Sequence, residues 1–127
     1  MRELKELTTE LCKSASQLES HCLSTAWSEN HLSAIINDEN YIYVTVSENQ
    51  NLVGVGGAIC SSVDSAEIFT VAVSKENRGK GIGKEIVSKL IDFCVSKNAE
   101  SIFLEVEDGN TPAHALYSSF GFKAVGK

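Results

Sequence analysis

The chain of 127 residues is poor in the features that mark special classes of protein. Its single proline and nine glycines exclude a collagen-like or low-complexity chain. No run approaches the roughly 18 apolar residues of a membrane-spanning helix. The charged segment 1–10 lacks the apolar core of a secretory signal. We therefore expect one globular domain over residues 1–127, located in the cytoplasm and not engaged with a membrane.

Cysteines are few and scattered, at Cys12, Cys22, Cys60 and Cys94. None forms a C-x-x-C pair, and no histidines cluster with them, so the pattern argues against a disulfide framework and a zinc site. A chain of this size buries about two-thirds of its unfolded surface, so it needs neither device to hold a core. We expect no metal.

Charge is distributed unevenly along the chain. Residues 1–64 carry three basic and nine acidic side chains, whereas residues 65–127 carry eight of each. The acidic half argues against nucleic acid as a direct ligand and suits a basic peptide or an amine. A local cluster of cations, which suits a phosphate-bearing ligand, surrounds one glycine-rich stretch: Lys75, Arg78, Lys80 and Lys84.

Hydrophobic periodicity and turn signals predict an α/β fold of the α+β type, with a mixed sheet flanked by helices. The expected order is β-α-α-β-β-β-α-β-α-β. A right-handed strand–helix–strand unit makes strands 66–73 and 101–106 parallel. The expected strands are 2–5, 41–47, 52–60, 66–73, 101–106 and 122–125; the expected helices begin at Thr8 or Thr9, Ser28, Gly81 and Thr111.

The segment from Arg78 to Lys84, RGKGIGK, follows a predicted strand and opens a predicted helix. Unpaired N–H groups and the helix dipole favour an anion there, and glycines allow phosphate oxygens to approach the backbone. A P-loop is excluded because only three residues separate Gly79 from Gly83. A dinucleotide fingerprint is excluded because Lys84 stands where a glycine is needed. The pattern that is left is R-x-x-G-x-G.

This loop and the order of elements resemble the GNAT acetyltransferase superfamily, whose pyrophosphate loop reads Q/R-x-x-G-x-G/A. Other segments resemble a narrower group, the RimI-type enzymes that acetylate the N-terminal alanine of a ribosomal protein. These segments are Ala26-Trp27-Ser28-Glu29, the strand Glu67–Val73, Leu104-Glu105-Val106, Asn110, Ala115-Leu116-Tyr117 and Phe120-Gly121-Phe122.

The resemblance implies acetyl-coenzyme A as cosubstrate and assigns roles to individual residues. Glu105 would be the general base and Tyr117 the general acid. Val71 and Val73 would present backbone groups to the pantetheine arm, and Asn110 would contact the cofactor from the last loop. The implied cofactor-binding set is Val71, Ala72, Val73, Arg78, Gly79, Lys80, Gly81, Ile82, Gly83, Lys84 and Asn110.

Each assignment has an alternative. Glu105 alternates with apolar neighbours on a strand, so an outward, solvated position is its plain interpretation. Tyr117 lies among apolar residues, so helix packing with its hydroxyl at a rim explains it equally well. Glu67 is a rival base on the neighbouring strand. His114 is interpreted as a surface residue of a helix rather than a catalytic one, and Trp27 as a core or rim packing residue rather than a platform for the substrate.

RimI-type chains continue through an aromatic-rich loop to a seventh strand, which would lie between 101–106 and 122–125. We expect its absence to leave open ladder groups, filled by another segment or by a homodimer through the open sheet edge.

The hypothesis we favour is acetyl transfer to a protein N-terminus, such as that of a ribosomal protein, with Ala or Ser as first residue. The alternatives are a small-molecule amine acetyltransferase, acting on a polyamine or antibiotic, and a catalytically weak coenzyme-A-binding module.

Overall fold

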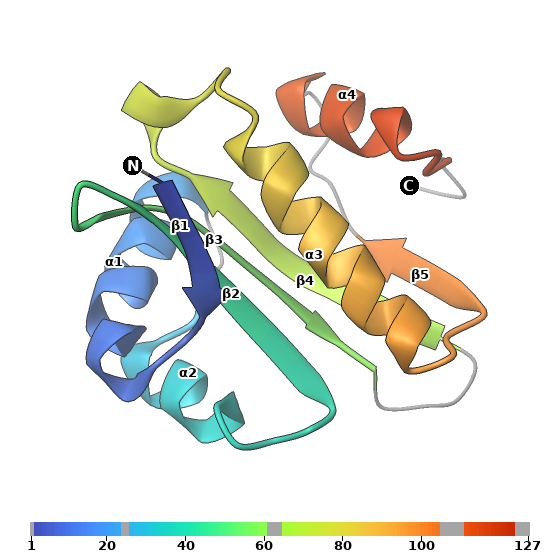
Figure 1. The fold of residues 1–127 in the computed structure, drawn as a ribbon, viewed down its shortest axis with the longest axis horizontal. Helices are drawn as coiled ribbons and strands as arrows, with labels where there is room; N and C mark the ends of the chain where they lie inside the picture. The colour runs from blue at the N-terminus through green and yellow to red at the C-terminus, as the bar shows by residue number, and fades with distance from the viewer. Residues whose placement is uncertain (1, 24–25, 61–64, 105–110, 124–127) are drawn as a thin grey trace.

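The computed structural model describes residues 2–23, 26–60, 65–104 and 111–123 (Figure 1). Its elements follow the expected order as far as the last helix. They are β1 (Arg2–Glu6), a 3-10 turn (Thr9–Leu11), α1 (Cys12–Cys22), α2 (Glu29–Ile35), β2 (Tyr41–Glu48), β3 (Asn51–Ile59), β4 (Ser65–Val73), a second 3-10 turn (Lys75–Asn77), α3 (Ile82–Ser96), β5 (Ser101–Leu104) and α4 (Thr111–Ser119).

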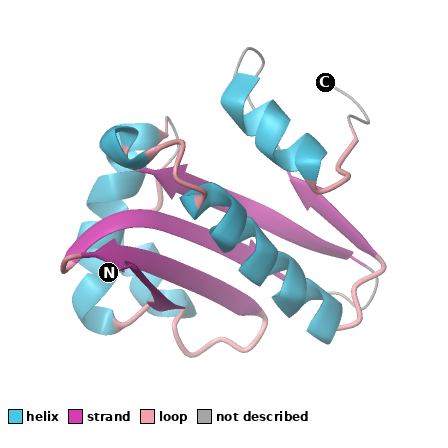
Figure 2. Cartoon of the chain, turned by 45° about the horizontal axis from the view of Figure 1, so that its top comes forward, coloured by secondary structure: helices cyan, strands magenta, loops and turns pink. Residues whose placement is uncertain are grey.

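The five strands form one mixed sheet in the sequential order β1-β2-β3-β4-β5. Neighbours are antiparallel from β1 to β4, and β4 and β5 are parallel, which confirms the prediction from the strand–helix–strand unit. Helices α1 and α2 cover one face of the sheet, and α3 and α4 lie on the other (Figures 1 and 2). The mixed α/β fold expected from the sequence is therefore the one observed.

Helix α3 can lie close to the sheet because β3 carries glycines beneath it. A Cβ at Gly54 would come within 2.9 Å of Ile82 Cγ2, and one at Gly56 would collide with Ile86 Cγ2. The apolar residues of α3 that pack on the sheet recur at helical spacing and are buried: Ile82, Ile86, Val87, Leu90 and Cys94. The position of α3, and so of the loop at its start, depends on these contacts.

Strand β4 carries a β-bulge and then loses one neighbour. Its pairing with β3 skips one residue, since Gly57 faces Thr70 and Ala58 faces Ile68, so Phe69 is the extra residue. The pairing with β5 extends only to Ile68 opposite Leu104. Beyond that point, in the part of the chain that the structure describes, the β5 side of β4 has no strand beside it.

Most element boundaries agree with those expected from the sequence. Two differ, namely the start of the first helix and the last strand. The first helix begins with a 3-10 turn, and its α-helical part starts at Cys12. Ser28 caps α2 as expected, since its Oγ accepts a hydrogen bond from the His31 N–H at 3.2 Å.

The prediction of a last strand at 122–125 is wrong for its first two residues, because Phe122 and Lys123 are irregular. The other two residues of that range lie outside the described residues. Gly121 adopts a φ of +91° after α4, and the Phe122 N–H bonds the Tyr117 carbonyl at 3.2 Å. This Schellman motif uses the donor that a strand would have needed.

We predict that Gly56→Ala lowers the free energy of unfolding by about 1–3 kcal/mol, the usual cost of overpacking a core. The added methyl group would meet Ile86 and Leu90 of α3. Ser88→Ala, on the exposed side of the same helix, is the control and should change stability little. Denaturant unfolding measures both variants. A Gly56→Ala protein as stable as wild type would show that α3 does not pack this closely on β3.

Candidate active site

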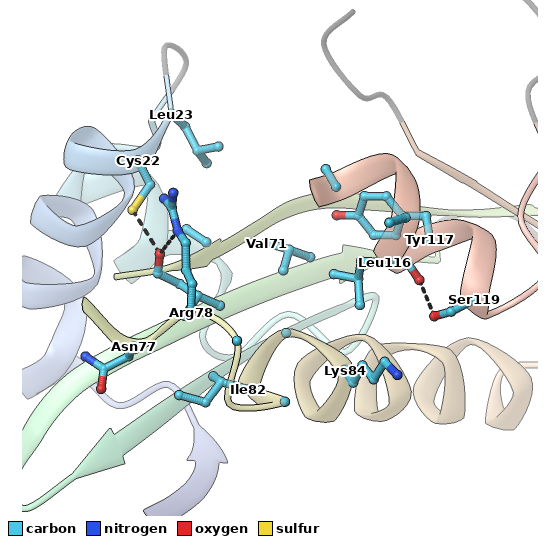
Figure 3. Close-up of a pocket in the computed structure, with 17 residues that line it drawn as sticks. Cys22, Leu23, Val71, Asn77, Arg78, Ile82, Lys84, Leu116, Tyr117 and Ser119 are labelled. Carbon is cyan, nitrogen blue, oxygen red and sulfur yellow. Dashed lines mark hydrogen bonds between the residues drawn. The ribbon is translucent and has the colours of Figure 1, made fainter. Parts of the chain in front are cut away.

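A pocket of about 680 Å³ lies where the C-terminal end of β4, the loop before α3, the first turn of α3 and helix α4 meet (Figure 3). The C-terminal end of α1 closes one side of it. The pocket is lined by Cys22, Leu23, Val71, Ala72, Val73, Asn77, Arg78, Gly79, Gly81, Ile82, Gly83, Lys84, Ala113, Ala115, Leu116, Tyr117 and Ser119.

The loop presents backbone rather than side chains to this space. Gly79 and Gly81 have φ values of +82° and +83°, in the left-handed region that favours glycine. Gly81 is the N-cap residue of α3, so the N–H groups of Ile82, Gly83 and Lys84 have no intrahelical acceptor. All three residues line the pocket. The arrangement is suited to an anion such as a pyrophosphate.

The end of β4 also presents backbone groups to the pocket. The Ser74 N–H bonds the Val53 carbonyl of β3 at 2.9 Å. Because antiparallel ladders alternate, Ala72 and Thr70 also face β3, and the N–H and C=O groups of Val71 and Val73 point the other way. In the described part of the chain no strand lies on that side, so the N–H groups of Val71 and Val73 and the Val71 carbonyl face the pocket rather than a neighbouring strand.

Two side chains already use the Val73 carbonyl. Arg78 Nε donates to it at 3.1 Å and the Cys22 thiol at 3.6 Å, as the dashed lines in Figure 3 show. This carbonyl therefore points into the pocket. The remaining guanidinium nitrogens of Arg78 stay in reach of a negatively charged ligand.

Lys80, which the resemblance placed in the cofactor set, does not line the pocket. Its Nζ donates to Asn77 Oδ1 at 3.1 Å and lies 3.7 Å from Glu48 Oε1 of β2. The loop is also held by Arg2 of β1, whose Nη1 donates to the Lys80 carbonyl at 3.1 Å and whose Nη2 lies 3.0 Å from Glu85 Oε2. These contacts hold the loop on the side away from the pocket, and they do not use the side that faces the pocket.

Tyr117 is brought to the same pocket by α4. Its ring packs edge-on against Phe122, with centroids 5.9 Å apart, and its hydroxyl points toward the space above Val71 (Figure 3). Burial raises the pKa of Tyr117 to about 12. The residue is therefore protonated throughout the physiological range and is a hydrogen-bond donor.

The carboxylates expected to act as base do not line the pocket in the described part of the chain. Glu67 is exposed on β4, opposite Phe103 of β5 in the ladder. Glu105 and Asn110 lie outside the described residues. His114 is exposed on α4, as expected.

Some pocket residues carried no signal in the sequence. Cys22 and Leu23 close the pocket from α1, more than 40 positions before the glycine loop. The periodicity assigned Cys22 only to the apolar face of a helix. Leu116 was part of the Ala115-Leu116-Tyr117 match but was given no role there; a Cβ on Gly83 would approach it to 3.2 Å, so it joins α4 to the first turn of α3. Long-range packing of this kind leaves no local pattern.

No three His, Cys, Asp or Glu side chains among the described residues lie together as metal ligands would. None of the helices in these ranges is long and apolar enough to span a membrane.

Comparison with known proteins gives one consistent result. The model of the acetyltransferase (GNAT) family matches residues 4–122. The ribosomal protein bS18-alanine N-acetyltransferase of Escherichia coli K12 is 29% identical over 123 residues, which are 96% of this chain and 81% of the relative. The Haemophilus influenzae protein of the same name is 35% identical over 88 residues, or 68% of this chain and 58% of the relative.

A solved structure extends this likeness to three dimensions. The crystal structure of the ribosomal-protein-S18-alanine N-acetyltransferase from Escherichia coli aligns with a TM-score of 0.84 at 25% identity. The alignment covers 99% of this chain and 80% of that one.

We predict that Arg2→Ala weakens coenzyme A binding about two- to fivefold, because an exposed ion pair contributes roughly 0.2–1 kcal/mol. Losing Arg2 frees the Lys80 carbonyl and Glu85, so the loop must be ordered by the ligand. Lys5→Ala, on the same strand, is the matched control and should bind like wild type. Calorimetry measures the affinity of each variant for coenzyme A. Equal affinities for the two variants would show that Arg2 does not help to order the loop.

Proposed function

Because the chain belongs to the GNAT family of acetyltransferases, we propose that it acetylates the N-terminal α-amino group of a protein, of the ribosomal-protein-alanine type. The observation that carries this proposal is the meeting of three features at one pocket. They are the glycine-rich loop, the outward-facing backbone of β4 and the Tyr117 hydroxyl. The named relatives supply the acceptor class.

The pocket suits acetyl-coenzyme A as cosubstrate. We assign the pyrophosphate to the N–H groups of Gly79 to Lys84, assisted by the Arg78 guanidinium. The amide groups of the pantetheine arm would pair with the Val71 carbonyl and the Val73 N–H, as an added strand pairs with a sheet edge; the Val73 carbonyl is already bound by Arg78 and Cys22. Asn110 completes the proposed set from the last loop. Lys80 contributes through its backbone, because its side chain is engaged with Asn77 and Glu48.

The proposed reaction is direct transfer. The neutral amine attacks the thioester carbonyl, so an N–C bond forms as the C–S bond breaks. An α-amino group has a pKa near 7.7–8, so a modest base suffices, and we assign Glu105 to accept the proton, directly or through water. The Val71 N–H would stabilise the oxyanion. Tyr117 would donate its proton to the departing sulfur.

The acceptor is tested by a direct screen. Peptides beginning with Ala or Ser are offered with acetyl-coenzyme A beside polyamines and aminoglycosides, and products are identified by intact mass. Acetylation of the peptide α-amino group supports the proposal. Acetylation of only the small amines would replace the protein acceptor, and coenzyme A binding without any product would leave a binding module.

The outer edge of β5 has no strand beside it in the described ranges, and Phe103 is 53% exposed there. A homodimer through this edge is part of the proposal. We also propose that the chain acts as one domain in the cytoplasm.

We predict that Gly81→Val weakens coenzyme A binding at least about tenfold, equivalent to about 1.4 kcal/mol. A β-branched residue is strained at a φ of +83°, so the loop must distort or lose its turn into α3. Lys80→Ala should have a smaller effect, because that side chain faces away from the pocket. If calorimetry finds Gly81→Val equal to wild type, the pyrophosphate does not bind at this loop.

We predict that Glu105→Gln lowers turnover roughly 10²–10⁴-fold, as loss of a general base does, while coenzyme A affinity is retained. The deficit should shrink at high pH, where the acceptor amine is already neutral. Glu67→Gln is the matched control on the neighbouring strand. A pH–rate profile of each variant measures the effect, and the reverse pattern would assign the base to Glu67.

A further inference from the structure

The buried carboxyl group of Glu19 has no part in the proposed reaction, and it joins three elements. Glu19 lies on α1 and is fully buried. Its Oε1 accepts a hydrogen bond from the Trp27 N–H at 3.0 Å, and its Oε2 accepts one from the Tyr43 hydroxyl of β2. Thr70 of β4 is also buried and lies close enough to lower the pKa of this carboxyl.

These partners are all uncharged. In the described part of the chain, no lysine, arginine or histidine forms an ion pair with Glu19. Burial raises the pKa of the carboxyl, and the hydrogen bonds only partly oppose that effect. A buried carboxyl without a cation costs stability relative to an apolar side chain of similar size. The stability of the fold therefore does not explain why a carboxyl group occupies this position. A function of Glu19 must then lie in the groups that it binds.

The group held most directly is Trp27, in the segment that leads from α1 into α2. Both of its backbone polar groups are bound to α1, because its carbonyl also accepts from Ser16 Oγ at 2.8 Å. Its ring lies against Phe69, with centroids 4.6 Å apart, and meets Tyr41 at 6.4 Å. Phe69 is the bulge residue of β4, so Glu19 fixes an aromatic ring on the bulge itself.

Among the described residues, the bulge follows directly on the last pair of the β4–β5 ladder, Ile68 opposite Leu104. The pocket proposed for the cofactor is formed by β4, the loop before α3, α3 and α4, with Cys22 and Leu23 at one side, whereas Trp27 and Phe69 belong to the hydrophobic cluster on the α1 and α2 side (Figure 1). Once the cofactor fills the pocket, an acceptor amine would approach a thioester near Val71 from the other face of β4, through an entrance that we call the mouth. Trp27 and Phe69 lie on that face, and Phe69 precedes Val71 by two residues.

We propose that Glu19 is a positioning residue for the acceptor: it holds the Trp27 segment against the β4 bulge and so shapes the mouth by which the amine enters. This inference rests on the proposed acetyl transfer. It concerns the acceptor and not the cofactor, whose binding groups lie in the glycine loop and the outward backbone of β4.

The test compares Glu19→Gln with Glu10→Gln, the same chemical change at an exposed residue before α1. In Glu19→Gln the amide oxygen can accept from only one of the two present donors. If it keeps the Trp27 N–H, the amide nitrogen faces the Tyr43 hydroxyl, which must then accept instead of donate and turn its proton to another group, so the attachment of the segment is weakened. We expect the KM for an acceptor peptide to rise about tenfold, within the range that a small misplacement of reacting groups costs. The KM for acetyl-coenzyme A should stay within about twofold, since its site keeps its contacts.

A second readout needs no activity. Trp27 is the only tryptophan of the chain, so intrinsic fluorescence reports on this segment alone. We expect Glu19→Gln to shift the emission to longer wavelength and to increase quenching by acrylamide, with Glu10→Gln like wild type. If Glu19→Gln does not fold, Tyr43→Phe removes one partner of the same carboxyl and should produce smaller changes of the same kind.

The outcomes separate the two proposals. An unchanged acceptor KM, or equal rises in both KM values, would overturn the role of Glu19 even if acetyl transfer is established. If the wild-type chain acetylates no peptide, the proposed function fails, and Trp27 quenching alone decides whether Glu19 positions the segment. Wild-type quenching in both Glu19→Gln and Tyr43→Phe would overturn it.

Discussion

The end of the described β4–β5 ladder at Ile68 and Leu104 is the feature on which the proposed site depends. Up to that pair β4 is a central strand with both edges paired, and beyond it, in the described residues, the edge that faced β5 has no strand beside it. Backbone groups in a partly buried position need partners, so an open edge beside a pocket favours a ligand that carries amides of its own. The bulge at Phe69 falls at the same point and changes which face each following side chain occupies. The pocket beside the end of β4 and the contact of Phe69 with Trp27 on the other face of the sheet therefore both lie next to this one irregularity.

The proposed site also requires that the N-terminus of α3 has a fixed position beside this edge of β4. The glycines of β3 let the helix lie directly on the sheet, and its buried stripe leaves little freedom to slide. Its N-terminus then stands over the end of β4, where the left-handed Gly81 turns the chain into the helix. From the other side, Arg2 and Glu48 hold the loop through Glu85 and Lys80. The position of the glycine loop is thus a consequence of core packing and of surface charge, not of the loop sequence alone.

The sequence was informative where structure is local and less so where it is long-range. The glycine loop, the helix beginning at residue 82, the Ser28 cap and the parallel strand pair follow from spacing and residue type, and the structure confirms them. The contact of Cys22 with Val73, that of Lys80 with Glu48 and that of the buried Glu19 with Tyr43 join residues 51, 32 and 24 positions apart, for which no pattern exists in one sequence. The strand expected from Phe122 failed for a local reason that composition does not distinguish, because a helix-ending motif and a strand start compete for the same N–H group.

Desolvation in the pocket affects both the acceptor amine and the Tyr117 hydroxyl of the proposed reaction. The pocket is walled by apolar groups such as Leu23, Val71 and Leu116, and the same surroundings raise the pKa of Tyr117 to about 12. Burial disfavours whichever form is charged, so it lowers the pKa of an entering ammonium group as it raises that of a phenol. An apolar site therefore favours the neutral, nucleophilic amine and keeps the proton on the tyrosine at the same pH. A departing thiolate is destabilised there as well, and this increases its need for the hydrogen bond that Tyr117 is placed to give. Removing a proton from the amine therefore takes a weaker base in this site than in water, and a carboxylate is strong enough.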